Sequence, residues 1–207
     1  MLIVPSDYHA RNGVVLKTSQ ESLEKTEMKK LKEKFYTFSH KPTGYEKKVI
    51  QKTFLMPNGK PYTSFVDRTP DSVNIFPMTS DGQIVLVKQF RPGIEKVEFE
   101  LPGGMIDPGE KPSRAAEREL LEETGYEGNV EFLSSRSYSP YSSGMRHVFV
   151  ATGCNKVSDL DLDPDEFLEV AVVDMEDLEN LLYEGKIRNP DGAYMALHHL
   201  GLLTIRF

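Results

Sequence analysis

Short apolar runs separated by turn-forming residues predict strands and hairpins in the first half of the chain. Residues 47–69 predict two strands joined around Pro57-Asn58-Gly59, where Asn-Gly supplies the positive φ angles of a tight turn. Residues 72–78 and 83–90 predict a second hairpin, with a turn at Ser80-Asp81-Gly82. The run 83–90 is apolar and β-branched enough to be a central strand.

The second half alternates predicted strands with predicted helices. Residues 97–104 form a short strand that ends in a glycine pair. Residues 112–124 form a helix with a proline near its start and Gly125 as its stop. Two more helices occupy 175–203 and are broken at Asn189-Pro190-Asp191-Gly192. The remaining strands are 129–138, 147–154 and 167–175. This interleaving predicts a mixed-sheet α/β or α+β domain.

The N-terminal part predicts a helix over residues 19–38. Its sparse apolar stripe consists of Leu23, Leu31, Phe35 and Phe38. We interpret this segment as a charged surface helix; the alternative is a basic docking helix, which the alternation of Glu with Lys disfavours. The chain is therefore expected to divide into residues 1–68, a helix with a small β subdomain, and a main domain of residues 69–207.

Composition narrows the class of protein. Hydrophobic residues make up 39% of the 207 positions and charged residues 28%, which is typical of a globular chain and excludes a disordered one. The 25 Lys and Arg against 32 Asp and Glu argue against a nucleic-acid partner, because such binding depends on dense basic surfaces. Cys154 is the single cysteine, and the N-terminus lacks a signal-peptide pattern. A cytoplasmic protein without a membrane span is expected.

The predicted helix at 112–124 crowds three carboxylates onto one face, because Glu119, Glu122 and Glu123 are spaced i, i+3 and i+4. Like charges at these spacings repel, and Arg118 supplies one positive charge nearby. Hard divalent ions such as Mg²⁺ prefer carboxylate oxygens and bind jointly to phosphates, so this face is a candidate metal platform. The alternative is an ordinary solvent-facing Glu-rich helix.

The surrounding residues favour the metal platform because they match a known motif. The chain fits the pattern G-x5-E-x7-R-E-U-x-E-E-x-G-U, with U a bulky apolar residue, and so resembles the Nudix hydrolases. The matching positions are Gly104, Glu110, Arg118, Glu119, Leu120, Glu122, Glu123, Gly125 and Tyr126. The mildest fit is Tyr126, an aromatic residue where an aliphatic one is usual.

The resemblance implies an α/β/α sandwich that binds Mg²⁺ or Mn²⁺ and hydrolyses a nucleoside diphosphate linked to another group. Glu119 and Glu123 would be the main metal ligands, assisted by Glu122 and the backbone carbonyl of Gly103. Arg118 would orient the glutamates. The structural positions would be Glu110, which braces the loop, and Gly104 and Gly125, which form a tight turn and a helix stop.

Outside the motif, VLVKQFRPG and EFELPGGMIDPGE resemble the ADP-ribose pyrophosphatase and nucleoside-diphosphate-sugar hydrolase branch. That resemblance implies substrate contacts from Arg68, Arg91, Glu100 and Met105. A structural salt bridge is the alternative for Arg91. Pro140 lies where this branch carries a marker proline, but the surrounding SPYSSGMRH departs from the usual Ser-Pro-Gly context and leaves the terminal group of the substrate open.

A glutamate that positions the attacking water is expected before a late strand, and Glu166 fits that place. Its substitutes in the same acidic segment are Asp163, Asp165 and Glu169, and a solvated acidic turn is the alternative reading. The resemblance also implies a homodimer, in which N-terminal aromatic residues of the partner stack on adenine. Here Tyr62 or Phe65 would serve, unless both only pack within strands.

These features predict a homodimeric, Mg²⁺-dependent enzyme that cleaves ADP-ribose, or a related nucleoside diphosphate sugar, to AMP and ribose 5-phosphate. In that reading Glu122, Glu123 and Glu166 are catalytic. Other nucleotide substrates, such as GDP-mannose, NADH or a dinucleotide, are the first alternative, and a non-catalytic nucleotide sensor is the second. His147, His198 and His199 lack the spacing of metal ligands, so surface or helix packing is expected for them.

Overall fold

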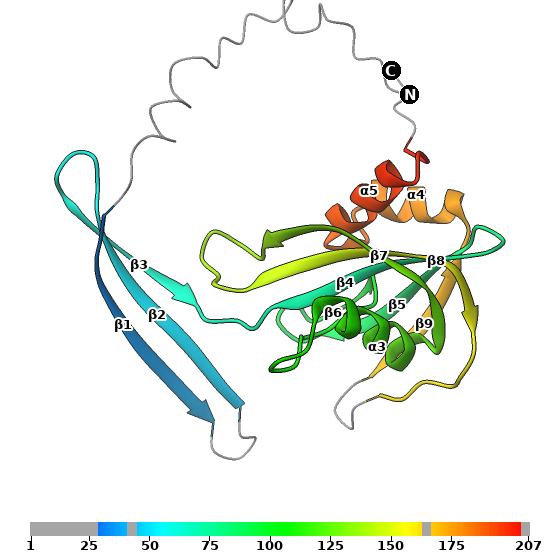
Figure 1. The fold of residues 1–207 in the computed structure, drawn as a ribbon, viewed down its shortest axis with the longest axis horizontal. Coiled ribbons are helices and arrows are strands. Elements are labelled where there is room, and N and C mark those ends of the chain that lie inside the picture. Colours follow the sequence, from blue (N-terminus) through cyan, green and yellow to red (C-terminus); the bar gives the residue numbers. More distant parts are fainter. Residues whose placement is uncertain (1–28, 41–44, 163–166, 204–207) are drawn as a thin grey trace, which may run out of the picture. The chain divides into compact units, whose positions relative to one another are not determined.

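The computed structural model describes residues 29–40, 45–162 and 167–203. The chain divides into two compact units, Met1–Arg68 and Thr69–Phe207 (Figure 1). In chain order the described elements are β1 (Lys29–His40), β2 (Tyr45–Leu55), β3 (Pro61–Asp67), β4 (Ser72–Thr79), β5 (Ile84–Arg91), β6 (Lys96–Glu100), α3 (Pro112–Thr124), β7 (Tyr126–Ser137), β8 (Met145–Lys156), β9 (Leu168–Val173), α4 (Met175–Tyr183), β10 (Ile187–Arg188) and α5 (Pro190–His199).

The N-terminal unit contains an antiparallel sheet in the order β1-β2-β3. The predicted hairpin between β2 and β3 is confirmed, but its turn differs from the prediction. Gly59 alone in this turn has a positive φ, at 74°, and its N–H donates to the carbonyl of Met56. Asn58 instead accepts a hydrogen bond from the Lys60 N–H at 3.0 Å. The loop is therefore a three-residue turn closed by a left-handed glycine.

The predicted helix over 19–38 is wrong where the structure describes it, because residues 29–40 form strand β1. Residues 1–28 lie outside the described part of the chain. Phe35 pairs with Ile50, and the next residue, Tyr36, pairs with Val49, so successive side chains alternate between the two faces of the sheet. The Lys and Glu residues favour a helix locally, but pairing with β2 and the aromatic residues near the end of β1 favour a strand.

The second unit is built on a seven-stranded mixed sheet, which confirms the predicted fold class, an α/β/α sandwich. Six strands follow the order β10-β6-β5-β4-β8-β7, and β9 pairs with β5. The β4–β8 and β10–β6 pairs are parallel, and the other pairs are antiparallel. Helix α3 covers one face of this sheet, and α4 and α5 cover the other (Figure 1).

Two apolar clusters fix the helices to the sheet. Ile75 of β4 faces α3, and the next residue, Phe76, faces α4 and α5; both are fully buried. Leu120 of α3 is also buried, and burial of a side chain of this size contributes roughly 1.5–3 kcal/mol. The alternation along β4 therefore fixes which helix lies on which face of the sheet.

The predicted break between the last two helices is partly wrong. Helix α4 ends at Tyr183, a two-residue strand β10 follows, and α5 already begins at Pro190. Asn189 precedes this helix in a left-handed conformation, with φ 57°. Proline suits the first helical position because its missing N–H is not needed there. The sequence Asn189-Pro190-Asp191-Gly192 therefore starts a helix rather than interrupting one.

Candidate active site

Helix α3 presents an apolar side to the sheet and an acidic side to a cleft. Pro112 is its first residue, and Gly125 ends it with φ 72° and an N–H that donates to the carbonyl of Leu121 at 2.8 Å. The side chains that bury it against the sheet are Ala115, Ala116 and Leu120. The residues of α3 that line the cleft are Arg118, Glu119, Glu122 and Glu123.

Arg118 is the centre of a charged network. Its Nε and Nη2 donate to the two oxygens of Glu110 at 3.1 and 3.0 Å, and its Nη1 donates to Glu119 at 2.9 Å and Glu122 at 3.0 Å. Nη2 also donates to the carbonyl of Met105 at 3.1 Å. The hydrogen bonds from Arg118 lower the pKa of Glu110, and those to Glu110 raise the pKa of Arg118. The Arg118–Glu110 pair therefore stays ionised near neutral pH.

The glycine pair after β6 brings the backbone close to α3. The N–H of Gly103 donates to Oε2 of Glu123 at 2.7 Å, and Glu123 is 4% exposed. A side chain at Gly103, where φ is 151°, would collide with the carbonyl of Val73, and one at Gly104 would collide with the carboxylate of Glu119. Gly103 is needed because the loop lies directly against the backbone of β4, and Gly104 because it packs against the acidic side of the helix.

The cleft beside α3 has a volume of about 620 Å³ and a mostly polar wall. Its lining residues are Gln89, Arg91, Gly103, Gly104, Met105, Asp107, Arg118, Glu119, Glu122, Glu123, Asp161 and Leu162. Five of these residues carry carboxylates, the hard oxygen donors that Mg²⁺ prefers. Within the described residues, no three of the acidic, His or Cys side chains come close enough together to hold an ion. Nη1 of Arg118 bonds both Glu119 and Glu122, so a cation in the cleft would share these carboxylates with the guanidinium.

Arg91 lies on the opposite wall of the cleft, on β5. Its Nε and Nη2 donate to the two carboxylate oxygens of Glu100 at 2.5 and 2.7 Å. The Arg91 side chain is 38% exposed and the Glu100 side chain 7%. Glu100 thus points at Arg91 from a buried position on β6, so the structure contains the salt bridge that was the alternative for Arg91. Met105, which is 64% exposed, contributes to the same cleft.

Some of the predicted site residues lie elsewhere. Arg68 belongs to the N-terminal unit, so its substrate contact stays a prediction. Glu166, Asp163 and Asp165 lie outside the described residues. Glu169 does not line the cleft; it lines a neighbouring cavity, and Leu162 contributes to both.

Sequence reasoning missed other residues of the cleft, namely Gln89, Asp107 and Asp161. Asp161 belongs to the acidic segment that was singled out for a base, and its N–H donates to the carbonyl of Glu122 at 3.0 Å. Gln89 directly precedes the Phe90-Arg91 pair of the branch pattern. Asp107 lies inside the motif at a position that the pattern leaves free.

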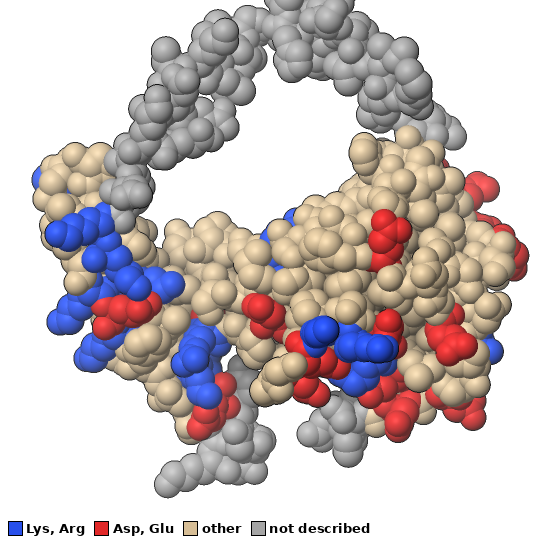
Figure 2. Space-filling view, in the orientation of Figure 1, with Lys and Arg blue, Asp and Glu red and all other residues tan. Residues whose placement is uncertain are grey.

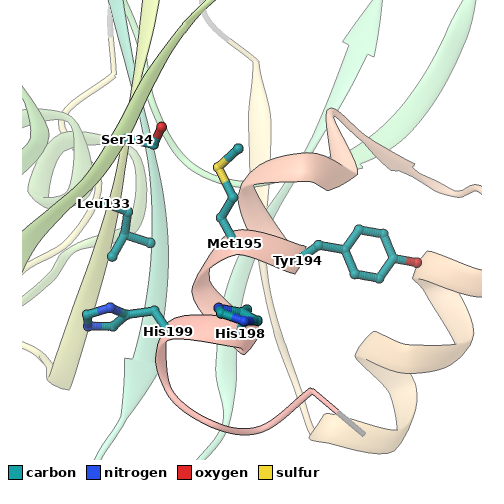
Figure 3. Close-up of a pocket in the computed structure, with 6 residues that line it drawn as sticks. All are labelled: Leu133, Ser134, Tyr194, Met195, His198 and His199. Atoms are coloured by element: carbon teal, nitrogen blue, oxygen red, sulfur yellow. The ribbon is translucent and has the colours of Figure 1, made fainter. Parts of the chain in front are cut away.

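Another cavity, of about 440 Å³, is lined by residues of β7 and α5 (Figure 3). Leu133 and Ser134 of β7 line one side, and Met195, His198 and His199 of α5 line the other. His198 and His199 are exposed, in line with the expected surface position, and Nε2 of His199 lies 3.4 Å from Oε1 of Glu131. The cavity shares no lining residue with the acidic cleft.

Charge is divided unevenly between the two units. Residues 1–68 contain 13 Lys and Arg against seven Asp and Glu, whereas residues 69–207 contain 12 against 25. Figure 2 shows blue side chains gathered on the N-terminal sheet and red ones spread over the second unit. The acidic cleft therefore lies in a unit of net negative charge, which favours binding of a cation.

Membrane insertion through a helix finds no support, because none of the described helices is long and apolar enough to cross a bilayer.

Comparison with known proteins gives a consistent result. The sequence pattern of the NUDIX domain matches residues 68–193. An ADP-ribose pyrophosphatase of Bacillus subtilis (strain 168) is 35% identical over 150 residues, which cover 71% of this chain and 80% of that protein. A methanol dehydrogenase activator of Bacillus methanolicus is 35% identical over 135 residues, covering 64% and 73%.

A solved structure supports the same fold. The crystal structure of an ADP compounds hydrolase superposes with a TM-score of 0.69, covering 86% of this chain and 98% of that one. Its sequence identity is 23%, so this likeness concerns the fold alone.

Proposed function

The chain belongs to the Nudix hydrolase family, in its ADP-ribose pyrophosphatase branch, and we propose that it uses Mg²⁺ to cleave ADP-ribose, or a related nucleoside diphosphate sugar, to AMP and a sugar phosphate. The observation that carries the proposal is the cleft itself. The carboxylates of α3 form one wall and Arg91 lies on another, a pairing that suits a diphosphate held together with a cation.

The donors in the cleft fit a hard divalent ion. Glu119, Glu122, Glu123 and the carbonyl of Gly103 would hold Mg²⁺, or Mn²⁺ in its place. Bound there, the ion would neutralise the diphosphate and lower the pKa of a coordinated water. The hydrogen bonds that Arg118 makes to Glu119 and Glu122 orient those carboxylates before the ion arrives.

Several residues around the carboxylates are proposed to position other side chains without taking part in the cleavage step. Glu110 holds Arg118 with two hydrogen bonds and so ties the loop to the helix. Glu100 holds Arg91 in the same way, which makes Glu100 a positioning residue and Arg91 the group that contacts the substrate. The salt bridge to Glu100 and a substrate contact by Arg91 are therefore compatible, because the salt bridge fixes the orientation of the guanidinium that would contact the substrate.

The water-positioning acid is proposed to be Glu166. Asp161 also carries a carboxylate into the cleft, five residues earlier in the chain, and Glu169 lies in a different cavity. Glu166→Gln and Asp161→Asn, compared at saturating Mg²⁺, separate the two acids. The proposal expects the larger loss of kcat from Glu166→Gln, and a larger loss from Asp161→Asn would move the role to Asp161.

A homodimer is proposed as the functional assembly. The basic residues 1–68 of one copy and the acidic residues 69–207 of another are complementary in charge, which would favour their association. Light scattering after size exclusion tests this: the proposal expects twice the mass of the chain, with a shift toward the monomer at high salt. A monomer at low salt and micromolar concentration would contradict it.

A second candidate function comes from the methanol dehydrogenase activator of Bacillus methanolicus, whose identity to this chain equals that of the pyrophosphatase. Activation of a dehydrogenase is therefore an alternative use of the same scaffold. The test adds this chain to a methanol dehydrogenase assay, with Glu123→Gln as the control. Stimulation by both proteins would indicate activation through binding, and stimulation by the unaltered chain alone would tie activation to hydrolysis.

The substrate is tested with a panel of ADP-ribose, GDP-mannose, ADP-glucose, NADH and a diadenosine polyphosphate, with products resolved by chromatography. We expect ADP-ribose to exceed the others by at least about tenfold in kcat/KM, a difference near 1.4 kcal/mol of transition-state binding. If another compound is preferred, we expect the residues that change the specificity to lie in the segment SPYSSGMRH, residues 139–147. Hydrolysis of none would favour a nucleotide sensor.

A further inference from the structure

Three arginines gather around the start of α5, outside the cleft. Arg136 on β7 and Arg146 on β8 occupy directly opposite positions of an antiparallel pair. Arg188 forms the end of β10, two residues before α5 begins. Like charges directly opposite each other in a sheet are destabilising, so this arrangement calls for compensating negative charge.

The carboxylates nearby compensate only part of that charge. Arg136 Nη2 lies 2.9 Å from Oδ1 of Asp191, and Arg188 Nη1 lies 3.1 Å from Oε2 of Glu98. Arg146 makes no salt bridge with any residue that the structure describes; its guanidinium lies 4.8 Å from the centre of the Tyr138 ring. A half-buried arginine that stacks on an aromatic ring retains all its N–H donors for another partner.

Two further observations indicate that the positive charge and the hydrogen-bond donors of this cluster are not fully compensated. Burial lowers the pKa of Arg146, and the charges of Arg136 and Arg188 lower it further, while Asp191 opposes them. Nε of Arg136, a hydrogen-bond donor, is buried without a partner among the described residues. Oδ2 of Asp191 is also unpaired there, but it is an acceptor and does not itself favour an anion. An added anion would relieve the repulsion among the guanidinium groups.

We propose that Arg146, together with Arg136 and Arg188, forms a binding site for the phosphate group of a small molecule. A phosphate dianion offers oxygens in several directions and suits donors that come from three different strands, and arginine forks match its geometry. A carboxylate has less charge and fewer oxygens. The Arg136 and Arg188 side chains are 37% and 41% exposed, so a ligand can reach the cluster from solvent.

The test measures binding of inorganic phosphate by calorimetry with EDTA present, so that no metal holds phosphate in the catalytic cleft. We expect the unaltered chain to bind phosphate and Arg146→Gln to weaken that binding at least about tenfold. Arg114→Gln is the matched control, because Arg114 is an exposed arginine paired with Glu117 on α3, and it should bind normally.

A second variant guards against a folding defect in Arg146→Gln. Arg188 is more exposed, so Arg188→Gln should keep the native circular dichroism spectrum and also weaken phosphate binding. Equal phosphate affinity in the unaltered chain and both variants would overturn the proposal. So would the lack of phosphate binding by the folded, unaltered chain at about 10 mM, a concentration at which a site even of millimolar affinity would be largely filled.

Competition then identifies where the phosphate comes from. If AMP displaces inorganic phosphate and Arg146→Gln weakens both ligands, the site binds phosphate monoesters of nucleotides. If AMP fails to compete, the site binds free phosphate. Either result supports the phosphate site, which does not depend on the proposed hydrolase activity.

Discussion

The backbone N–H of Gly103 donates a 2.7 Å hydrogen bond to Oε2 of Glu123, twenty residues further along the chain. This bond joins the residue just before the motif to the last turn of α3, because Gly103 follows strand β6 and Glu123 lies near the end of the helix. The carbonyl of Gly103 and the carboxylate of Glu123 are thereby held near each other before any ion binds.

Arg118→Lys should lower kcat/KM by about 10- to 100-fold, because lysine lacks the planar fork that binds Glu110 through two nitrogens and also reaches Glu119 and Glu122. Steady-state kinetics across a Mg²⁺ titration check this, and the Mg²⁺ requirement should rise. Arg114→Lys, on the exposed side of the same helix, is the control. Equal kinetics for the two variants would show that the network is not needed.

Gly104→Ala should reduce activity by at least about tenfold, since the new methyl group would take the space of the Glu119 carboxylate and displace a proposed metal ligand. Backbone strain does not contribute, because the φ of Gly104 lies outside the left-handed region. Gly93→Ala, where the added carbon meets nothing within 4 Å, is the matched control and should be neutral. Normal turnover of Gly104→Ala would argue against this close packing.

Glu100→Gln should raise KM roughly tenfold with a smaller change in kcat. An amide cannot offer Arg91 two charged oxygens, so the guanidinium would lose its fixed orientation in the cleft. Kinetics over a range of substrate concentrations separate the two constants. If KM is unchanged while thermal stability falls, the Arg91–Glu100 pair is structural.

Cys154 should make the fold less stable at alkaline pH. Burial raises the pKa of its thiol to about 11, from an ordinary value near 9. Below pH 9 both folded and unfolded states hold the proton, and between pH 9 and 11 the unfolded state loses it first. The free energy of unfolding should therefore fall by about 1.4 kcal/mol per pH unit through this window.

Urea titrations at pH 8 and pH 10 check this prediction, with Cys154→Ala removing the effect of the thiol. Relative to Cys154→Ala, the free energy of unfolding of the unaltered chain should be lower at pH 10 than at pH 8. Because Cys154 is 1% exposed, its thiol should also resist alkylation at pH 8 until the chain unfolds. A pH-independent difference would contradict the assignment.

Local signals predicted the site-bearing elements well. The bounds of α3, 112–124, follow from a proline at its start and a glycine at its end, and both signals act within one turn. The motif residues on α3 also line one cleft, because spacing along a helix determines which side chains share a face.

Features that depend on distant residues could not be read from the sequence in this way. The sequence of β1 has the pattern of a charged helix, and its backbone hydrogen bonds to β2, which no local pattern reports, make it a strand. Asp161 enters the cleft because its backbone bonds to Glu122, 39 positions earlier, and no local pattern reports that contact. Likewise, the sequence does not show that Arg136 and Arg146 are neighbours, because only the register of β7 and β8 places them opposite each other.

The central claim is that the carboxylates of α3 hold the metal that drives diphosphate cleavage. The most direct measurement is Mg²⁺-dependent hydrolysis of ADP-ribose by the unaltered chain, Glu123→Gln and Glu117→Gln. Glu117 is a control from the same helix; it is half exposed, outside the cleft and paired with Arg114. We predict a loss on the order of a hundredfold or more in kcat for Glu123→Gln and little change for Glu117→Gln, since removing a metal ligand removes the charge stabilisation it supports. Near-normal turnover by a folded Glu123→Gln protein would contradict the account.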